Sequence, residues 1–97
     1  MNTEEIERKL KEKKVHIKRV FHIREMGIFG SYIRGEQTEA SDVDILVEFE
    51  KGHKDFFNYM RLKYYLEDLL GGEVDLVMKN AVKPRLKKRI FSEVEYV

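Results

Sequence analysis

Three short apolar segments alternate with helix-forming segments along this chain, and this alternation constrains the fold more than any other feature. Residues 20–29 and 74–78 are rich in β-branched and other apolar side chains, and residues 43–49 form a nearly continuous apolar run. Segments of this length and composition are typical of buried β-strands. Strands that alternate with helices predict an α/β (α+β) fold, in which helices pack on a small mixed β-sheet.

The first two helices are predicted from capping residues and apolar spacing. Residues 3–18 carry apolar side chains near helical spacing among Lys and Glu, and Asn2 or Thr3 can cap this amphipathic helix. From Ser31 the chain is polar, so we expect a very short helix there that ends at Gly35.

The two later helices carry clear start and stop signals. Asp55 can cap a helix with apolar side chains at helical spacing, and Gly71 with Gly72 would end it in a left-handed turn. Pro84 suits the first position of a final basic helix that reaches about residue 91. The spaced side chains of the longer helix are Tyr59, Leu62, Leu66 and Leu69.

The size and composition of the chain set its class. The 97 residues are 42% hydrophobic, which is enough for one core, so we expect one domain over residues 1–97. The absence of cysteine excludes disulfides, thiolate metal sites and a cysteine nucleophile. The chain opens with charged residues, and no apolar run approaches the roughly 20 residues of a membrane span. We therefore expect a cytoplasmic protein without a membrane partner.

Two surface features bear on partners. Basic side chains near the C-terminus are typical of a solvated helix face, and contact with phosphate or nucleic acid is the less favoured interpretation. Residues 56–70 carry more large apolar and aromatic side chains than a monomer of this size can cover, which predicts a homodimer or a hetero-oligomer. The basic residues are Lys83, Arg85, Lys87, Lys88 and Arg89.

Three aspartates lie in or beside the predicted strands. Asp42 and Asp44 are two residues apart, so both carboxylates point to one face of a strand. Paired carboxylates on an apolar strand repel each other, but they become favourable around Mg²⁺, which takes oxygen ligands. Asp75 interrupts the third apolar segment and is the candidate third ligand. For Asp42 alone, a role in the turn before the strand is the alternative.

The turn after the first predicted strand has the features of a phosphate-binding turn. Gly30 permits close approach of the backbone, and Ser31 begins a short helix whose free N–H groups favour an anion. Arg34 lies one helical turn further along the chain. It could contact a phosphate in a bidentate manner, or it could brace the loop through Glu36 or Glu39, and the sequence favours neither role.

These motifs together resemble the signature of the minimal nucleotidyltransferase (MNT) family of the DNA polymerase β superfamily. The similarity is carried by Gly-Ser-Tyr-Ile-Arg-Gly-Glu at residues 30–36, Ser-Asp-Val-Asp-Ile-Leu-Val at residues 41–47 and Val-Asp-Leu-Val at residues 74–77. It extends over nearly the whole chain. Ile33 departs from the pattern, because many relatives carry a small residue there; its side chain either shifts the motif helix or packs inward.

The resemblance implies a polymerase β-like nucleotidyltransferase fold and a role for each motif residue. Asp42 and Asp44 would hold two Mg²⁺ ions, and Asp75 would complete the ion that activates an acceptor hydroxyl. Gly30 and Ser31 would bind the β and γ phosphates of the nucleotide, which the family indicates is ATP. The reaction would be transfer of AMP with release of pyrophosphate.

The resemblance also implies a partner. Members of the MNT family are commonly paired with a helical HEPN protein, often a toxin ribonuclease, which they neutralise as antitoxins by transferring AMP to a tyrosine. The competing interpretation is a non-catalytic binding module that neutralises its partner by occlusion. Transfer to RNA or to a small molecule is a third interpretation, but no acceptor-binding segment for it can be recognised.

Overall fold

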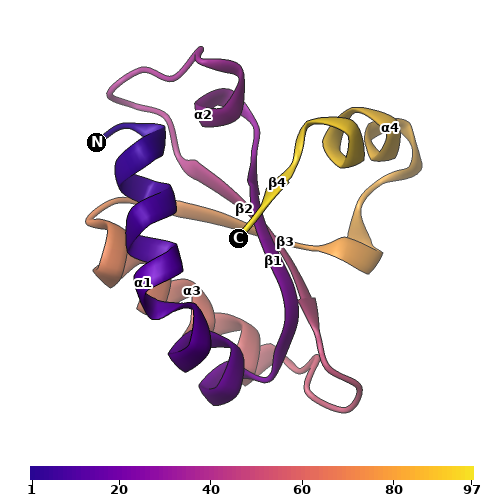
Figure 1. Cartoon of the computed structure of the whole chain (residues 1–97). Coiled ribbons are helices and arrows are strands. Elements are labelled where there is room, and N and C mark those ends of the chain that lie inside the picture. Colours follow the sequence, from indigo (N-terminus) through magenta and orange to yellow (C-terminus); the bar gives the residue numbers. More distant parts are fainter.

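The computed structural model describes residues 1–97 as a four-stranded mixed sheet with helices on both faces (Figure 1). The strand order is β3-β2-β1-β4; β2 and β3 run parallel, whereas β1 pairs antiparallel with both β2 and β4. The predicted fold class is therefore confirmed. The elements are α1 (Thr3–Phe21), β1 (Ile23–Phe29), α2 (Ser31–Arg34), β2 (Val43–Phe49), α3 (Phe56–Leu70), β3 (Val74–Met78), the 3-10 helix η1 (Lys79–Ala81), α4 (Pro84–Glu93) and β4 (Glu95–Tyr96).

The larger part of the core lies on the face of the sheet that α1 and α3 cover (Figure 1). Alternate residues of β2, such as Ile45, point to this face because side chains of a strand alternate between its two sides. The helices contribute the residues that the sequence pattern predicted, and the completely buried ones are Ile6, Leu10, Ile17, Leu62 and Leu66.

A smaller apolar cluster lies on the opposite face of the sheet, beneath α4. Phe29 of β1 and Leu46 of β2 contribute to it from the sheet, and Val82 and Ile90 contribute from the C-terminal segment. Because Leu46 points to this face, Asp44, two residues earlier on the same strand, points there as well. The face under α4 is therefore the one that carries the acidic side chains of the strands.

The boundary between the first helix and the first strand differs from the prediction. Val20 and Phe21 belong to α1 and not to the strand, because Phe21 continues the buried face of the helix that includes Ile17. His22 then adopts a left-handed conformation (φ 55°) and ends the helix. The side-chain amide of Asn58 donates a hydrogen bond of 2.8 Å to the carbonyl of Phe21, which holds this end of α1 against α3.

The predicted capping residues of the other helices are confirmed, whereas α4 begins at Pro84 as predicted but extends to Glu93 rather than to about residue 91. Asp55 caps α3 by accepting a hydrogen bond of 2.9 Å from the N–H of Asn58, and Gly71 ends the helix with φ 72°. Asn2 caps α1 in the same manner, and Gly35 ends α2. None of the helices combines the length and the apolar character that crossing a membrane requires.

The short strand β4 was not predicted. It pairs with β1 through Gly27 and Ile28, and the N–H of Val97 extends this pairing by donating to the carbonyl of Met26 at 3.0 Å. Gly27 is required for this close approach, because a Cβ there would lie 2.7 Å from the Val94 side chain. The strand thus returns the end of α4 to the sheet, next to the turn that follows β1.

Candidate active site

Two of the predicted acidic residues lie side by side on neighbouring strands. Asp44 near the start of β2 and Asp75 of β3 are direct partners in the parallel register. Asp44 is half-buried and Asp75 is exposed. The strand pairing therefore brings together two carboxylates that are 31 positions apart in the sequence, on the face of the sheet that α4 covers.

The environment of Asp44 disfavours its charged form. Burial is the main cause that raises the pKa of Asp44 to about 6, and the charge of Asp75 and a hydrogen bond with it act in the same direction. The charge of Asp42 adds to the increase, while the backbone N–H of Ser31 opposes it. No Lys or Arg forms an ion pair with any of the three aspartates. No ion pair therefore compensates the negative charge of these aspartates.

Gly30 brings the turn after β1 against the Asp44 carboxylate. Its φ of 78° lies in the region that favours glycine, and an added Cβ would overlap Oδ2 of Asp44. Ser31 then begins α2, as predicted, and Ile33 packs against the core rather than displacing this short helix. The Gly-Ser turn and the half-buried carboxylate thus form one contiguous structure.

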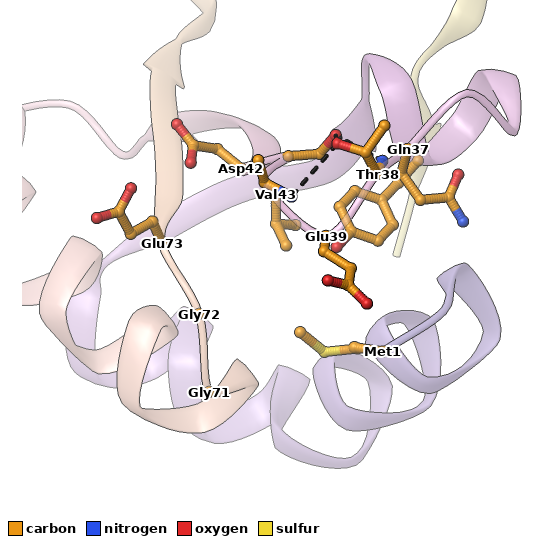
Figure 2. Close-up of a pocket in the computed structure, with 12 residues that line it drawn as sticks. Met1, Gln37, Thr38, Glu39, Asp42, Val43, Gly71, Gly72 and Glu73 are labelled. Atoms are coloured by element: carbon orange, nitrogen blue, oxygen red, sulfur yellow. Dashed lines mark hydrogen bonds between the residues drawn. The ribbon is translucent and has the colours of Figure 1, made fainter.

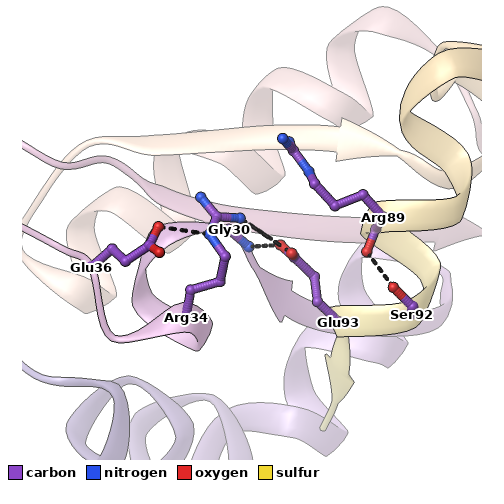
Figure 3. A network of polar contacts seen from close by, with 6 residues as sticks. All are labelled: Gly30, Arg34, Glu36, Arg89, Ser92 and Glu93. Carbon is purple, nitrogen blue, oxygen red and sulfur yellow. Dashed lines mark hydrogen bonds and ion pairs between the residues drawn. The ribbon is translucent and has the colours of Figure 1, made fainter.

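Arg34 is paired with two carboxylates (Figure 3). Its Nε donates to Glu36 at 2.9 Å, and its Nη1 donates to Oε2 of Glu93 at 3.0 Å. The same Glu93 oxygen accepts a hydrogen bond of 2.6 Å from the backbone N–H of Gly30. Bracing through Glu36 was one of the two expected roles of Arg34, whereas Glu39 takes no part. No local signal in the sequence indicates Glu93, because it acts across 59 positions.

Two hollows flank the start of β2. The smaller one, of about 330 Å³, contains four of the six predicted site residues, Gly30, Arg34, Asp44 and Asp75, and residues of the α4 region line it as well. The larger one, of about 700 Å³, contains only Asp42 of the six, together with the 37–43 loop, Met1 and the 71–73 turn (Figure 2). The smaller hollow is the better candidate for chemistry, because the acid pair and the Gly-Ser turn meet there.

The donor set of the smaller hollow fits a divalent cation. A hard cation such as Mg²⁺ prefers carboxylate oxygens, and its charge would offset the repulsion that Asp44 and Asp75 experience from each other. Asp42 is exposed and lines the other hollow, and no group of three acidic or histidine side chains is arranged as a ready-made metal site. The pair Asp44 and Asp75 is therefore the part of the predicted triad that the fold brings together.

A mixed sheet that presents paired carboxylates beside a Gly-Ser turn is the arrangement expected of a nucleotidyltransferase. The chain belongs to the nucleotidyltransferase domain family, which it matches over residues 3–97. It is 47% identical over 97 residues to the protein adenylyltransferase MntA of Thermococcus cleftensis, and this similarity covers 100% of the chain and 97% of that relative. The prediction of an enzyme that transfers nucleotidyl groups is thereby confirmed.

Solved structures agree with this assignment. A structure described as a minimal nucleotidyltransferase superposes with a TM-score of 0.82 at 36% identity, covering 98% of this chain and 95% of the other. A toxin–antitoxin structure with AMP-PNP superposes with a TM-score of 0.71 at 25% identity, covering 89% of this chain and 70% of the other. The predicted membership of the minimal nucleotidyltransferase family and the predicted fold are both confirmed.

Proposed function

We propose that this chain is a Mg²⁺-dependent protein adenylyltransferase that transfers AMP from ATP to a tyrosine of a HEPN-family toxin and so acts as an antitoxin. The observation that carries the proposal is the contact between the Gly30 turn and Asp44, next to Asp75, in a chain 47% identical to a protein adenylyltransferase. The AMP-PNP of the similar toxin–antitoxin structure supports ATP as the nucleotide.

The Gly30–Ser31 turn would bind the β and γ phosphates. Gly30 carries no side chain to keep a phosphate away from the backbone, and the Ser31 hydroxyl can donate a hydrogen bond to a phosphate oxygen. Of the two roles open to Arg34, its ion pairs with Glu36 and Glu93 support the bracing of this turn.

The aspartates would hold two Mg²⁺ ions, with Asp44 and Asp75 at the centre of the site and Asp42 at its rim. When bound, Mg²⁺ neutralises phosphate charge and stabilises charge on the entering and departing oxygens. Asp75 is the exposed member of the pair, so an acceptor from outside can reach it. The acceptor oxygen forms a bond to the α-phosphorus and releases its proton to solvent, while the bond to the pyrophosphate oxygen breaks.

A protein partner is supported by the surface of α3. Phe56 and Phe57 at its start are 70% and 76% exposed, and Tyr64 is 61% exposed. Large aromatic side chains are enriched at protein interfaces, where they lose contact with water. This surface would bind the HEPN-family partner in a hetero-oligomer, in keeping with the toxin–antitoxin assembly of the similar structure.

The position of the radioactive label in ATP tests the reaction. The chain is incubated with Mg²⁺, the product of the neighbouring gene and ATP labelled at either the α or the γ phosphate. AMP transfer labels the partner from α-labelled ATP only, whereas labelling from γ-labelled ATP would show phosphorylation instead. Glu50→Gln is the control for Asp75→Asn in this assay, because Glu50 is exposed, lies outside α3 and forms no ion pair or side-chain hydrogen bond.

The same assay separates the enzyme from the binding module. If Asp75→Asn loses labelling and no longer neutralises the partner, neutralisation depends on AMP transfer. If the wild type labels nothing and all the aspartate variants still neutralise the partner, occlusion by a non-catalytic module replaces the proposed reaction.

A further inference from the structure

Positively charged residues of α4 and the residue before it line the smaller hollow, which is the cavity that contains Asp44 and Asp75. Lys83 precedes Pro84, and Arg89 lies on the second turn of the helix; both residues line the cavity of about 330 Å³. The lining of this cavity therefore includes both carboxylates and cationic side chains. A cavity lined by both kinds of charge fits a ligand that carries phosphates and metal ions.

Of the two arginines in this cavity, Arg34 is already neutralised. Its guanidinium contacts Glu36 at 2.9 Å and Glu93 at 3.0 Å, and the Glu93 side chain is only 13% exposed. Glu93 also accepts a hydrogen bond from the Gly30 N–H, so Gly30, Arg34 and Glu93 form one hydrogen-bonded network (Figure 3). Arg34 would have to leave two carboxylates before it could bind a phosphate, which makes it a structural brace.

Arg89 differs from Arg34 because no side chain of the protein pairs with its guanidinium. It forms no ion pair, and its only side-chain partner is Ser92, whose hydroxyl donates to the Arg89 backbone carbonyl at 2.9 Å. Figure 3 shows the Arg89 side chain extending from α4 without a dashed contact to its guanidinium. The adjacent Ile90 is buried in the small core beneath α4, and this packing fixes the part of the helix from which Arg89 projects.

We propose that Arg89 binds the triphosphate of the nucleotide, and that Arg89 rather than Arg34 is the phosphate-binding arginine of this site. The assignment rests on the proposed function, because it names a ligand contact within that same site. A free guanidinium can form two parallel hydrogen bonds to a phosphate, which a lysine cannot do. Lys83 would add a second positive charge near the same phosphates. The basic C-terminal segment is then part of the nucleotide site and not only a solvated helix face.

Binding of three phosphate probes to the whole chain in Mg²⁺ tests the proposal. The probes are ATP, AMP and inorganic tripolyphosphate, measured by calorimetry for the wild type, Arg89→Ala and Arg85→Ala. Arg85 is the matched control because it lies on the same helix, is exposed and does not line the cavity. Loss of a charge-assisted hydrogen bond should weaken binding of ATP and tripolyphosphate to Arg89→Ala about 10-fold or more. Affinity for AMP should change less than about 3-fold.

Two further variants make the result specific. Arg89→Lys should recover part of the ATP affinity, since it restores the charge without the bidentate geometry. Arg34→Ala should lower the melting temperature while keeping most of the preference for ATP over AMP, as expected for a brace. Equal losses of ATP affinity in Arg85→Ala and Arg89→Ala would overturn the proposal, and so would equal losses for ATP and AMP in Arg89→Ala. If the wild type binds no ATP, the proposed function itself fails.

Discussion

Asp44→Asn should make the protein more stable in the absence of divalent ions, although it removes a central residue of the site. In the folded protein the pKa of Asp44 is raised from 3.8 to about 6, mainly by burial and then by Asp75. The folded state therefore holds this proton more tightly than the unfolded state, and stability falls as pH rises between these two values. Above the folded pKa the full penalty of the buried charge is present. Asparagine avoids this penalty and can donate a hydrogen bond to Asp75.

The size of the effect follows from the same values. At about 1.4 kcal/mol per pKa unit, the difference between 3.8 and about 6 corresponds to about 3 kcal/mol. Asp44 is only half-buried, so solvent screening reduces the expected gain to roughly 1.5 kcal/mol at pH 8. For a chain of this length the gain corresponds to an increase in melting temperature of about 6–12 °C. Near pH 4 the folded wild type is protonated at Asp44, and most of the gain should disappear.

Urea and thermal unfolding in EDTA at pH 8, 6 and 4 would measure this difference. Asp68→Asn serves as the control, and its effect should stay within about 0.5 kcal/mol at each pH because Asp68 is exposed without a partner. An Asp44→Asn variant that is no more stable than the wild type at pH 8 would refute the argument. A gain that is the same at pH 8 and pH 4 would refute it equally, because the charge of Asp44 would then not be its cause.

Asp75→Asn should keep much of the Mg·ATP affinity but lose about 100-fold or more of the transfer rate, because we propose that Asp75 acts on the acceptor side. Single-turnover labelling measures the transfer rate, and transfer at the wild-type rate would contradict this role. Gly30→Ala should lower the free energy of unfolding by about 1–3 kcal/mol, because φ is 78° and the new methyl group would overlap Asp44. Urea unfolding measures the loss, and a change below about 0.5 kcal/mol would contradict the predicted strain. Phe57→Ser should weaken assembly in light scattering and partner pull-down, because it removes an exposed aromatic side chain from the proposed interface. A wild type that is strictly monomeric and binds no partner would exclude an interface at α3.

The elements of the fold could be predicted from the sequence wherever a local signal was strong. Asp55, Gly71 and Pro84 mark helix ends through their own backbone and capping chemistry, and the structure places them at those ends. Val20 and Phe21 were assigned to a strand because β-branched and aromatic residues favour strands. In the structure both residues belong to α1, because Phe21 packs in the core on the same face of the helix as Ile17. Such packing is a tertiary effect that composition does not reveal.

The candidate site was predictable only in part, for a similar reason. Motif spacing predicted the Gly-Ser turn and three aspartates as site residues. The parallel register aligns Asp44 with Asp75, whereas Asp42 lines the other hollow. Glu93 could not be identified, because its contacts with Gly30 and Arg34 depend on how α4 folds back over the sheet. Arg89 was visible in the basic segment, but its position in the cavity also depends on that packing. Residues that complete a site from a distant helix are found by structure and not by spacing.

Titration of the protein with ATP, in Mg²⁺ and again in EDTA, tests the central claim most directly. The claim is that Asp44 and Asp75 form a carboxylate site through which a divalent ion holds the nucleotide. The wild type should bind ATP at least 10-fold more tightly in Mg²⁺ than in EDTA, because the ion is needed between carboxylates and phosphates that repel each other. Asp44→Asn should lose most of this difference, while Asp68→Asn keeps it. Equal ATP affinity of the wild type in Mg²⁺ and in EDTA would contradict the proposed site.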